Sequence, residues 1–212
     1  LFRSKSTYQL NSWNLSILTI LYYASIFDDA NREGSTMLIW ACRNEYTGLA
    51  LILIESGTFD LDKIDEEGNT ALIWACTNRM KMVALKLIEK GVSNLDQVDE
   101  YGNTALIWAC TNGMEIVAMK MLELGISNLD QANEDGNTAL IWACFYKLET
   151  VAIKILELGA LNLDQVDDME NTALIYACRK RLTIVALKIL ELEILNSSRI
   201  DKYKRLALYW AC

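Results

Sequence analysis

The chain of 212 residues contains no histidine and no proline. Histidine is the side chain whose unperturbed pKa lies nearest neutrality and the commonest ligand for transition metals, so its absence removes the usual general base and the usual metal ligand. The sequence also lacks a glycine-rich phosphate loop, a paired cysteine motif and a base that would activate a serine or cysteine. We therefore predict a protein that is not an enzyme and that holds no cofactor and no metal.

Positive charge is scarce, because 20 lysines and arginines stand against 28 aspartates and glutamates, which gives a formal net charge of −8. The basic residues form no long run. An acidic chain of this kind is a poor partner for a phosphate backbone or an anionic membrane surface. No stretch is long and apolar enough to span a bilayer. The expected partners therefore include neither nucleic acid nor membrane.

What the sequence does have is a strict period. Its six cysteines follow one another at intervals of 34 residues: Cys42, Cys76, Cys110, Cys144, Cys178 and Cys212. Each ends a recurring phrase whose clearest copy, at 68–76, reads Gly-Asn-Thr-Ala-Leu-Ile-Trp-Ala-Cys. A fixed period of this size is typical of stacked supersecondary units, none of which buries its apolar face alone. We predict one elongated domain built as a solenoid.

The same period argues against disulfides. Equivalent residues of stacked units lie about 10 Å apart, whereas a disulfide needs Cα atoms within about 7 Å. We therefore expect buried, reduced thiols, which are typical of a reducing compartment, and we predict a cytoplasmic location.

Each unit carries the signals of two short helices followed by a long turn. In the unit at 68–101, Thr70 is the expected N-cap of a first helix that ends near residue 78. A second helix is expected over about 81–90, and Gly91 follows it where a helix C-terminus favours a residue with positive φ. The rest of the unit is rich in turn-forming residues.

These features resemble the ankyrin repeat. The phrase Thr-Ala-Leu-Ile-Trp-Ala falls where ankyrin repeats carry Thr-Pro-Leu-His-x-Ala, and Asp-Glu-Tyr-Gly at 99–102 matches the Asp-x-x-Gly of their β-turn. Tetratricopeptide repeats have the same length, but their longer helices are joined by short turns. The resemblance implies an all-α repeat solenoid with a 34-residue period, in which each unit is a helix-turn-helix followed by a β-turn finger.

The sequence departs from the family pattern at three points. Alanine replaces the proline, as at Ala71, and isoleucine replaces the histidine, as at Ile73, so we expect apolar packing in place of a polar bond. The period is 34 rather than 33 residues, with the extra residue between 91 and 102. The phrases Asn-Thr-Ala-Leu-Ile and Ser-Asn-Leu-Asp resemble those of ankyrin proteins of giant DNA viruses of amoebae, which implies a viral protein.

The period divides the chain into a degenerate N-terminal repeat at 1–33, five ankyrin repeats at 34–203 and the start of a further, truncated repeat at 204–212. Arg3 and Lys5 ahead of the apolar segment 15–23 also resemble a signal peptide. However, this segment aligns with 49–57 one period later, which favours a repeat, since terminal repeats are atypical. The chain does not begin with methionine and stops within a phrase, so we expect it to be a piece of a longer protein.

Three periodic sets of side chains are candidate functional features. Aromatic residues recur at one register position and indicate either packing between units or a recognition stripe: Trp40, Trp74, Trp108, Trp142, Tyr176 and Trp210. Lysines and glutamates three residues apart, such as Lys86 and Glu89, are expected on a solvated outer surface. The loop aspartates lack EF-hand spacing and predict local turn hydrogen bonds: Asp62, Asp65, Asp96, Asp99, Asp130, Asp164 and Asp167.

The positions that vary between copies are those that the stack does not constrain. They fall after each cysteine and before each glycine of the phrase, which the ankyrin resemblance assigns to the end of the first helix and the finger tip, both on the concave surface where partners bind. Drift on an unused surface is the alternative explanation. The predicted partner-binding residues are Glu66, Glu67, Glu100, Tyr101, Glu134, Asp135, Phe145, Tyr146, Asp168, Met169, Arg179, Lys180, Lys202 and Tyr203.

We therefore expect a non-enzymatic scaffold that binds an intracellular protein partner, a host protein in the viral interpretation, on its concave surface. The alternative is a structural protein that assembles end to end. Apolar residues lie near both ends, at Leu15 and Leu18 and at Leu206 and Trp210. A head-to-tail contact between unlike ends does not close and propagates as a filament.

Overall fold

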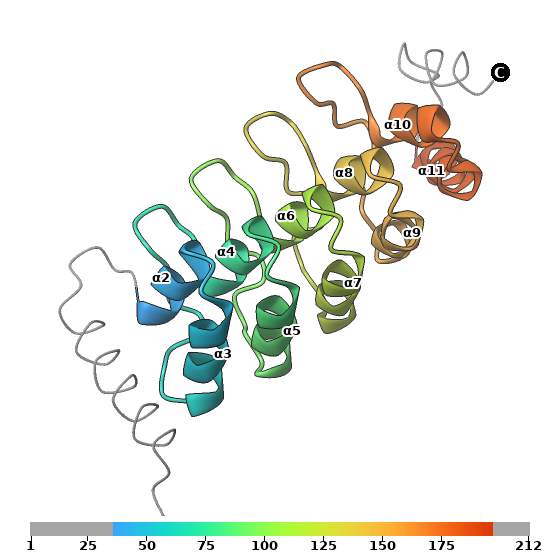
Figure 1. The fold of residues 1–212 in the computed structure, drawn as a ribbon. Coiled ribbons are helices and arrows are strands. Elements are labelled where there is room, and N and C mark those ends of the chain that lie inside the picture. Colours follow the sequence, from blue (N-terminus) through green and yellow to red (C-terminus); the bar gives the residue numbers. More distant parts are fainter. Residues whose placement is uncertain (1–35, 197–212) are drawn as a thin grey trace, which may run out of the picture.

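The computed structural model describes residues 36–196, and within them ten helices follow one another in five pairs (Figure 1). The first helices of the pairs are α2 (Met37–Arg43), α4 (Ala71–Thr77), α6 (Ala105–Thr111), α8 (Ala139–Phe145) and α10 (Ala173–Lys180). The second helices are α3 (Thr47–Ser56), α5 (Lys81–Glu89), α7 (Glu115–Leu124), α9 (Glu149–Glu157) and α11 (Thr183–Asn196).

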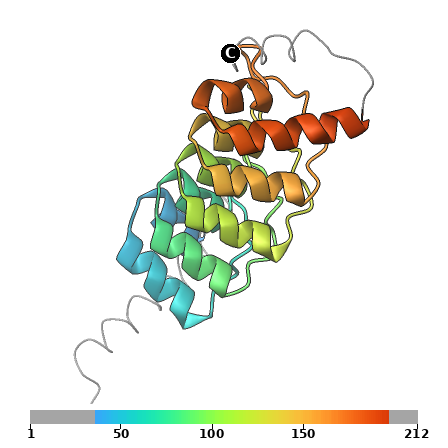
Figure 2. The ribbon, with the colours of Figure 1, turned by 90° about the vertical axis from the view of Figure 1, so that its right-hand side faces the viewer.

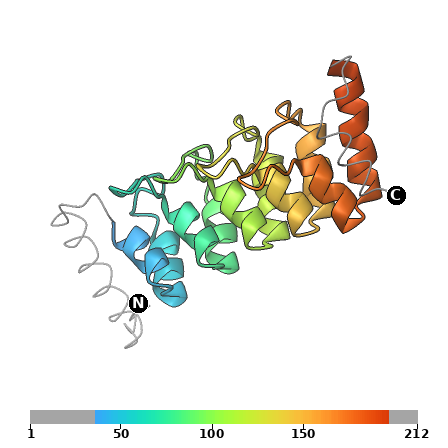
Figure 3. The same ribbon diagram turned by 90° about the horizontal axis from the view of Figure 1, so that it is seen from above.

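The pairs stack into a helical repeat solenoid, which confirms the predicted fold class. The first helices form one row and the second helices another, while the connecting loops project to one side as fingers (Figure 1). Figure 2 shows the second helices stacked side by side, and Figure 3 shows the fingers following one another along one edge. The proposed unit boundaries at 33 and 204 lie outside the described residues.

Each first helix begins at the threonine of its phrase. Thr70 is in extended conformation, and its hydroxyl accepts a hydrogen bond from the backbone N–H of Ile73 at 3.1 Å. The same cap forms at Thr36, Thr104, Thr138 and Thr172. A threonine in this position satisfies a backbone donor that the helix leaves open. The predicted N-cap and both predicted helices of this unit are confirmed.

The apolar residues of the phrase form the core. Ile73, Ile107, Ile141 and Ile175, which stand where the family pattern has histidine, are at most 1% exposed. The described cysteines carry free thiols; Cys178 is half-buried and the other four are buried. Burial raises the pKa of the Cys42 and Cys110 thiols to about 12, so these side chains act as small apolar residues.

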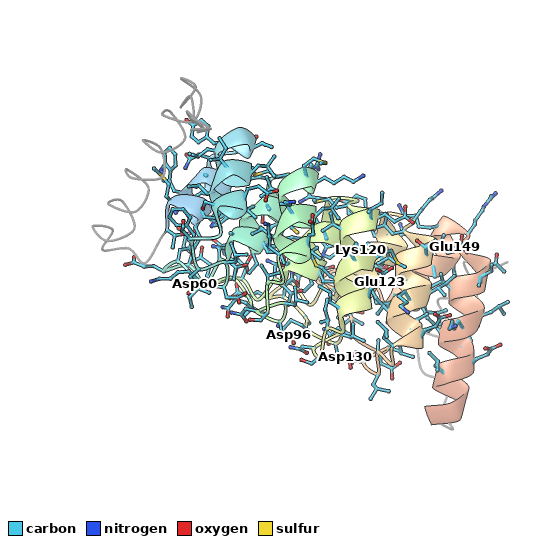
Figure 4. The ribbon with its side chains drawn as sticks, turned by 90° about the horizontal axis from the view of Figure 1, so that it is seen from below. Asp60, Asp96, Lys120, Glu123, Asp130 and Glu149 are labelled. Atoms are coloured by element: carbon cyan, nitrogen blue, oxygen red, sulfur yellow. The ribbon has the colours of Figure 1, made fainter. Side chains whose placement is uncertain are left out.

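Three of the loop aspartates, Asp62, Asp96 and Asp130, hold neighbouring fingers together. The carboxylate of Asp62 accepts hydrogen bonds from the backbone N–H groups of Ser93 at 2.9 Å and Asn94 at 3.1 Å, which belong to the next unit. Asp96 and Asp130, which follow one another along the loop edge in Figure 4, bind the next unit in the same way. The expectation of local turn bonds was therefore wrong for these three residues, because their acceptors lie opposite the following finger.

Two of the expected lysine–glutamate pairs form on the outer surface of the second helices, and Lys188 instead pairs with Glu157 of the preceding unit. Lys120 and Glu123 on α7, which are labelled in Figure 4, lie 2.7 Å apart. Lys86 also contacts Glu55 of the preceding unit, at 2.7 Å, in addition to Glu89. Exposed ion pairs of this kind contribute little to stability. In the part of the chain from 36 to 196, no helix has the length and apolar character needed to cross a membrane.

Candidate protein-binding surface

A buried aspartate lies at the base of each finger in three of the units. One carboxylate oxygen of Asp99 accepts from the backbone N–H groups of Tyr101 and Asn103, and the other accepts from the indole N–H of Trp108 at 2.8 Å. Asp65 binds Trp74 at the same distance. Packing and turn closure therefore account for these tryptophans, and the predicted local turn bonds are confirmed for the aspartates at this position.

Tyr176 occupies the tryptophan position of the last described unit and is expected to give the chain a pH-dependent stability. Burial, and then the hydrogen bond to Asp167 at 2.6 Å, raise the pKa of Tyr176 to about 12. In the unfolded chain tyrosine ionises near pH 10. The stabilisation is complete below pH 10 and is lost as the pH rises from 10 to 12, by about 2–3 kcal/mol in total.

The measurement is the free energy of unfolding of wild type and Tyr176→Phe as a function of pH. Below pH 10 the difference between the two proteins should be constant. Between pH 10 and 12 the wild type should lose stability relative to the phenylalanine variant. Parallel profiles over this interval would contradict the assignment.

The finger between α7 and α8 breaks this pattern, because Asn133 stands where the other three fingers have aspartate. Its side-chain oxygen still closes the turn, accepting from the backbone N–H of Asn137 at 2.8 Å. Its amide nitrogen donates instead to Asn103, at 2.9 Å. An amide presents a donor where the carboxylate presented an acceptor. Among the described residues, the indole N–H of Trp142 consequently has no hydrogen-bond partner.

A second series of repeated contacts, made by asparagines that follow the first helices, ends at α8. The side-chain amide of Asn78 donates to the carbonyls of Cys42 and Arg43 at the end of α2. Asn112 does the same to Cys76 and Thr77 at the end of α4. These residues therefore tie neighbouring units together, although the sequence comparison placed them among the positions free of the stack. The recurrence of asparagine at 44, 78 and 112 is the signal that could have identified them.

Aromatic side chains pack together at the end of α8, where the series of asparagines ends. Tyr146 replaces the asparagine and stacks on Trp142 with ring centroids 5.7 Å apart. Phe145 packs edge-on against Trp142, Tyr146 and Tyr176. The Lys180 ammonium lies over the Phe145 ring, 4.4 Å from its centroid, and Arg179 lies over Tyr176. We call Trp142, Phe145, Tyr146 and Tyr176 the aromatic cluster. Four of the predicted partner-binding residues therefore lie close together at the ends of α8 and α10. Phe145 and Tyr146 belong to the cluster, and Arg179 and Lys180 contact it.

The finger tips carry the other predicted residues. Tyr101 is 56% exposed and Met169 is 80% exposed. Glu66, Glu100, Glu134, Asp135 and Asp168 are also exposed. A hydrogen bond to Glu100 raises the pKa of Tyr101. Backbone bonds join the third finger to the second, from Glu134 N–H to the Tyr101 carbonyl at 2.9 Å, and the fourth to the third, from Asp168 N–H to the Asp135 carbonyl at 3.1 Å.

Not every predicted residue is equally available. Glu67 is half-buried, and one of its carboxylate oxygens lies 2.9 Å from the Arg43 guanidinium, so it joins its finger to the end of α2. Lys202 and Tyr203 lie outside the described residues. We call the surface formed by the finger tips and the C-terminal ends of the first helices the finger–helix face. It corresponds to the concave surface of the sequence prediction.

One exposed apolar set was not anticipated from the sequence. Met82, Ile116 and Ile184 stand at one register position of the second helices and are each more than half exposed. We call them the outer apolar row. They lie on the same helices as the lysine–glutamate pairs, on the surface that was expected to be solvated.

No group of three or more cysteine, aspartate and glutamate side chains within residues 36–196 is arranged to hold a metal ion. Six of the loop aspartates accept hydrogen bonds from backbone N–H groups or from aromatic donors: Asp62, Asp65, Asp96, Asp99, Asp130 and Asp167. The chemistry available on the finger–helix face is thus that of a recognition surface with aromatic, apolar, acidic and basic side chains.

Comparisons with known proteins agree with this architecture. A family model described as ankyrin repeats (3 copies) matches residues 10–99 and 83–163. Among solved structures, 433 chains match, so the fold by itself selects no partner. A crystal structure of an ankyrin repeat domain from Acinetobacter baumannii AYE matches with a TM-score of 0.65 and 24% identity, over 84% of this chain and 93% of that one. A search of curated proteins finds no match.

Proposed function

The chain belongs to the ankyrin repeat family, whose members generally mediate protein–protein interaction, and from this premise we propose that it is a non-enzymatic scaffold whose finger–helix face binds a protein partner. The observation that carries the proposal is the exposure of Tyr101, Tyr146 and Met169 on this face. Tyrosine and methionine are enriched in interfaces, and truncation of a few such anchors typically removes most of the binding energy.

The setting of this interaction is part of the proposal. Buried, free thiols support a reducing compartment, for which the cytoplasm is the natural choice. The resemblance of the repeated phrases to those of giant viruses of amoebae supports a host protein as the partner. The alternative of end-to-end assembly depends on Leu15, Leu18, Leu206 and Trp210, which lie outside the described residues, and it stays a prediction.

A capture experiment with a matched control tests the proposed face. The immobilised chain is incubated with host-cell cytosol, from amoebae in the first instance, and retained proteins are quantified by mass spectrometry. The test variant is Tyr101→Ala, Tyr146→Ala and Met169→Ala combined. The control exchanges Lys120 and Glu123 on α7, which keeps the ion pair and leaves the finger–helix face unchanged.

We expect the triple variant to lose, by about tenfold or more, a protein that wild type and the control variant retain equally. Circular dichroism of all three chains checks that the stack is intact. Equal retention by the triple variant, or equal loss in the control, would reject the finger–helix face as the binding surface.

A further inference from the structure

The aromatic cluster differs from the rest of the stack in having an unused donor. The polar atoms of Trp74, Trp108 and Tyr176 are bound by Asp65, Asp99 and Asp167. Trp142 has no such acceptor within the described part of the chain, because Asn133 turns its amide toward Asn103. Tyr146, stacked on Trp142, is 44% exposed. The cluster thus combines an accessible aromatic face with an indole N–H that still lacks an acceptor.

Three cations contact this cluster or adjoin its residues in the chain. Lys147, which follows Tyr146, and Arg181, which follows Lys180, are exposed, and the Lys180 ammonium lies over the Phe145 ring. None of these three residues takes part in an ion pair within residues 36–196, whereas Arg43, at the end of α2, is paired with Glu67. These three side chains therefore have no ion-pair partner among the described residues.

We propose that the aromatic cluster, with Lys147, Lys180 and Arg181, is the anchor site for an acidic linear segment of the protein partner. This inference rests on the proposed function and names the chemistry that the site recognises. Carboxylates of the segment lie against the three cations, an acceptor takes the indole N–H of Trp142, and an apolar side chain covers Tyr146. Each contact pairs a cation, the indole donor or the exposed ring of this site with a complementary group of the segment. Hydrogen bonds between charged groups are stronger than those between neutral groups.

The surrounding charges favour a peptide over a nucleic acid. The finger tips of the same units carry the exposed acids Glu134, Asp135 and Asp168, and the chain has a formal net charge of −8. A nucleic acid presents a phosphate at every nucleotide and would meet these acids as it passed along the face. A peptide with a few carboxylates can place them against the cations alone, which is the electrostatic complementarity that selects partners.

The equivalent positions of the other fingers suggest the substitution that tests this inference. Asn133→Asp restores the carboxylate found at Asp65, Asp99 and Asp167, so the variant is expected to fold. The new carboxylate accepts the indole N–H of Trp142 and adds a negative charge, and both changes oppose an acidic ligand. Lys147→Glu combined with Lys180→Glu removes the counter-charge by an independent route. The Lys120/Glu123 exchange is the control.

The probe is a random 12-residue peptide library displayed on phage and selected on the immobilised wild-type chain. Enriched peptides are then synthesised, and their affinity for each variant is measured by fluorescence anisotropy. We expect acidic peptides that contain an apolar residue. Their affinity should fall by about tenfold or more in both cluster variants and stay unchanged in the control. The melting temperature of Asn133→Asp should not fall below that of wild type.

Several results would overturn the inference. These are enrichment of neutral or basic peptides, no enrichment at all, and undiminished affinity in Asn133→Asp and Lys147→Glu/Lys180→Glu. An oligouridine of 12 nucleotides that competes for the same site and binds more tightly than the selected peptides would assign the site to nucleic acid. If Tyr101→Ala/Met169→Ala abolishes capture from cytosol while Lys147→Glu/Lys180→Glu retains it, the proposed function stands and this inference fails.

Discussion

An Asp99→Ala substitution is expected to lower the free energy of unfolding by about 3–5 kcal/mol. The carboxylate is 7% exposed and accepts from the backbone N–H groups of Tyr101 at 3.0 Å and Asn103 at 2.8 Å, and from the indole of Trp108 at 2.8 Å. Alanine leaves these donors without an acceptor, and each buried, unsatisfied donor costs about 1–3 kcal/mol. Urea unfolding followed by circular dichroism measures the loss.

The matched control is Asp99→Asn, which reproduces the arrangement that the chain already has at Asn133. The amide oxygen still closes the turn, and only the acceptor opposite Trp108 is lost. We expect this variant to lose less than the alanine variant, about 1–3 kcal/mol, the cost of leaving the one indole donor of Trp108 without an acceptor. Equal destabilisation by alanine and asparagine would show that turn closure contributes nothing, contrary to the role assigned to this residue.

A Gly136→Ala substitution should be at least as damaging, and for a different reason. Gly136 has a φ of +76°, and a Cβ added there would clash with the Val166 carbonyl oxygen of the next finger. The backbone of that finger would have to move, because the contact is with main chain. We expect a loss of about 3–5 kcal/mol in the free energy of unfolding, combining the left-handed conformation with the displaced finger.

Gly125→Ala separates these two contributions. Gly125 has a φ of +86°, but a Cβ there would meet nothing within 4 Å. Only the conformational cost applies, about 1–2 kcal/mol. If Gly125→Ala and Gly136→Ala unfold at the same urea concentration, the close approach of the fingers is not what requires glycine at position 136.

Local chemistry made much of the fold predictable. Thr70 and its equivalents cap their helices because a threonine hydroxyl accepts from a backbone donor three residues ahead, which is a relation within one unit. Gly91 takes a positive φ, as its place after a helix indicates. The burial of Ile73 follows from the helical spacing of the apolar residues.

Contacts between units were less accessible from the sequence. Asp62 binds Ser93 and Asn94, 31 and 32 residues ahead, and a turn pattern contains no information about this separation. Asn78 and Asn112 appeared variable because they lie beside variable residues, yet they close the ends of the preceding helices. The single exchange of aspartate for Asn133 leaves the fold unchanged and frees a donor on Trp142, which only the coordinates of both residues make visible.

Site-specific photo-cross-linking decides whether the finger–helix face is the binding surface. A benzoylphenylalanine is introduced at Tyr146 in one chain and at Ile116, in the outer apolar row, in another. Each chain is irradiated in host-cell cytosol, and adducts are identified by mass spectrometry. We predict an adduct with one partner protein from position 146 and none from position 116. An adduct from position 116 alone would contradict the proposed function and would place the partner on the outer apolar row.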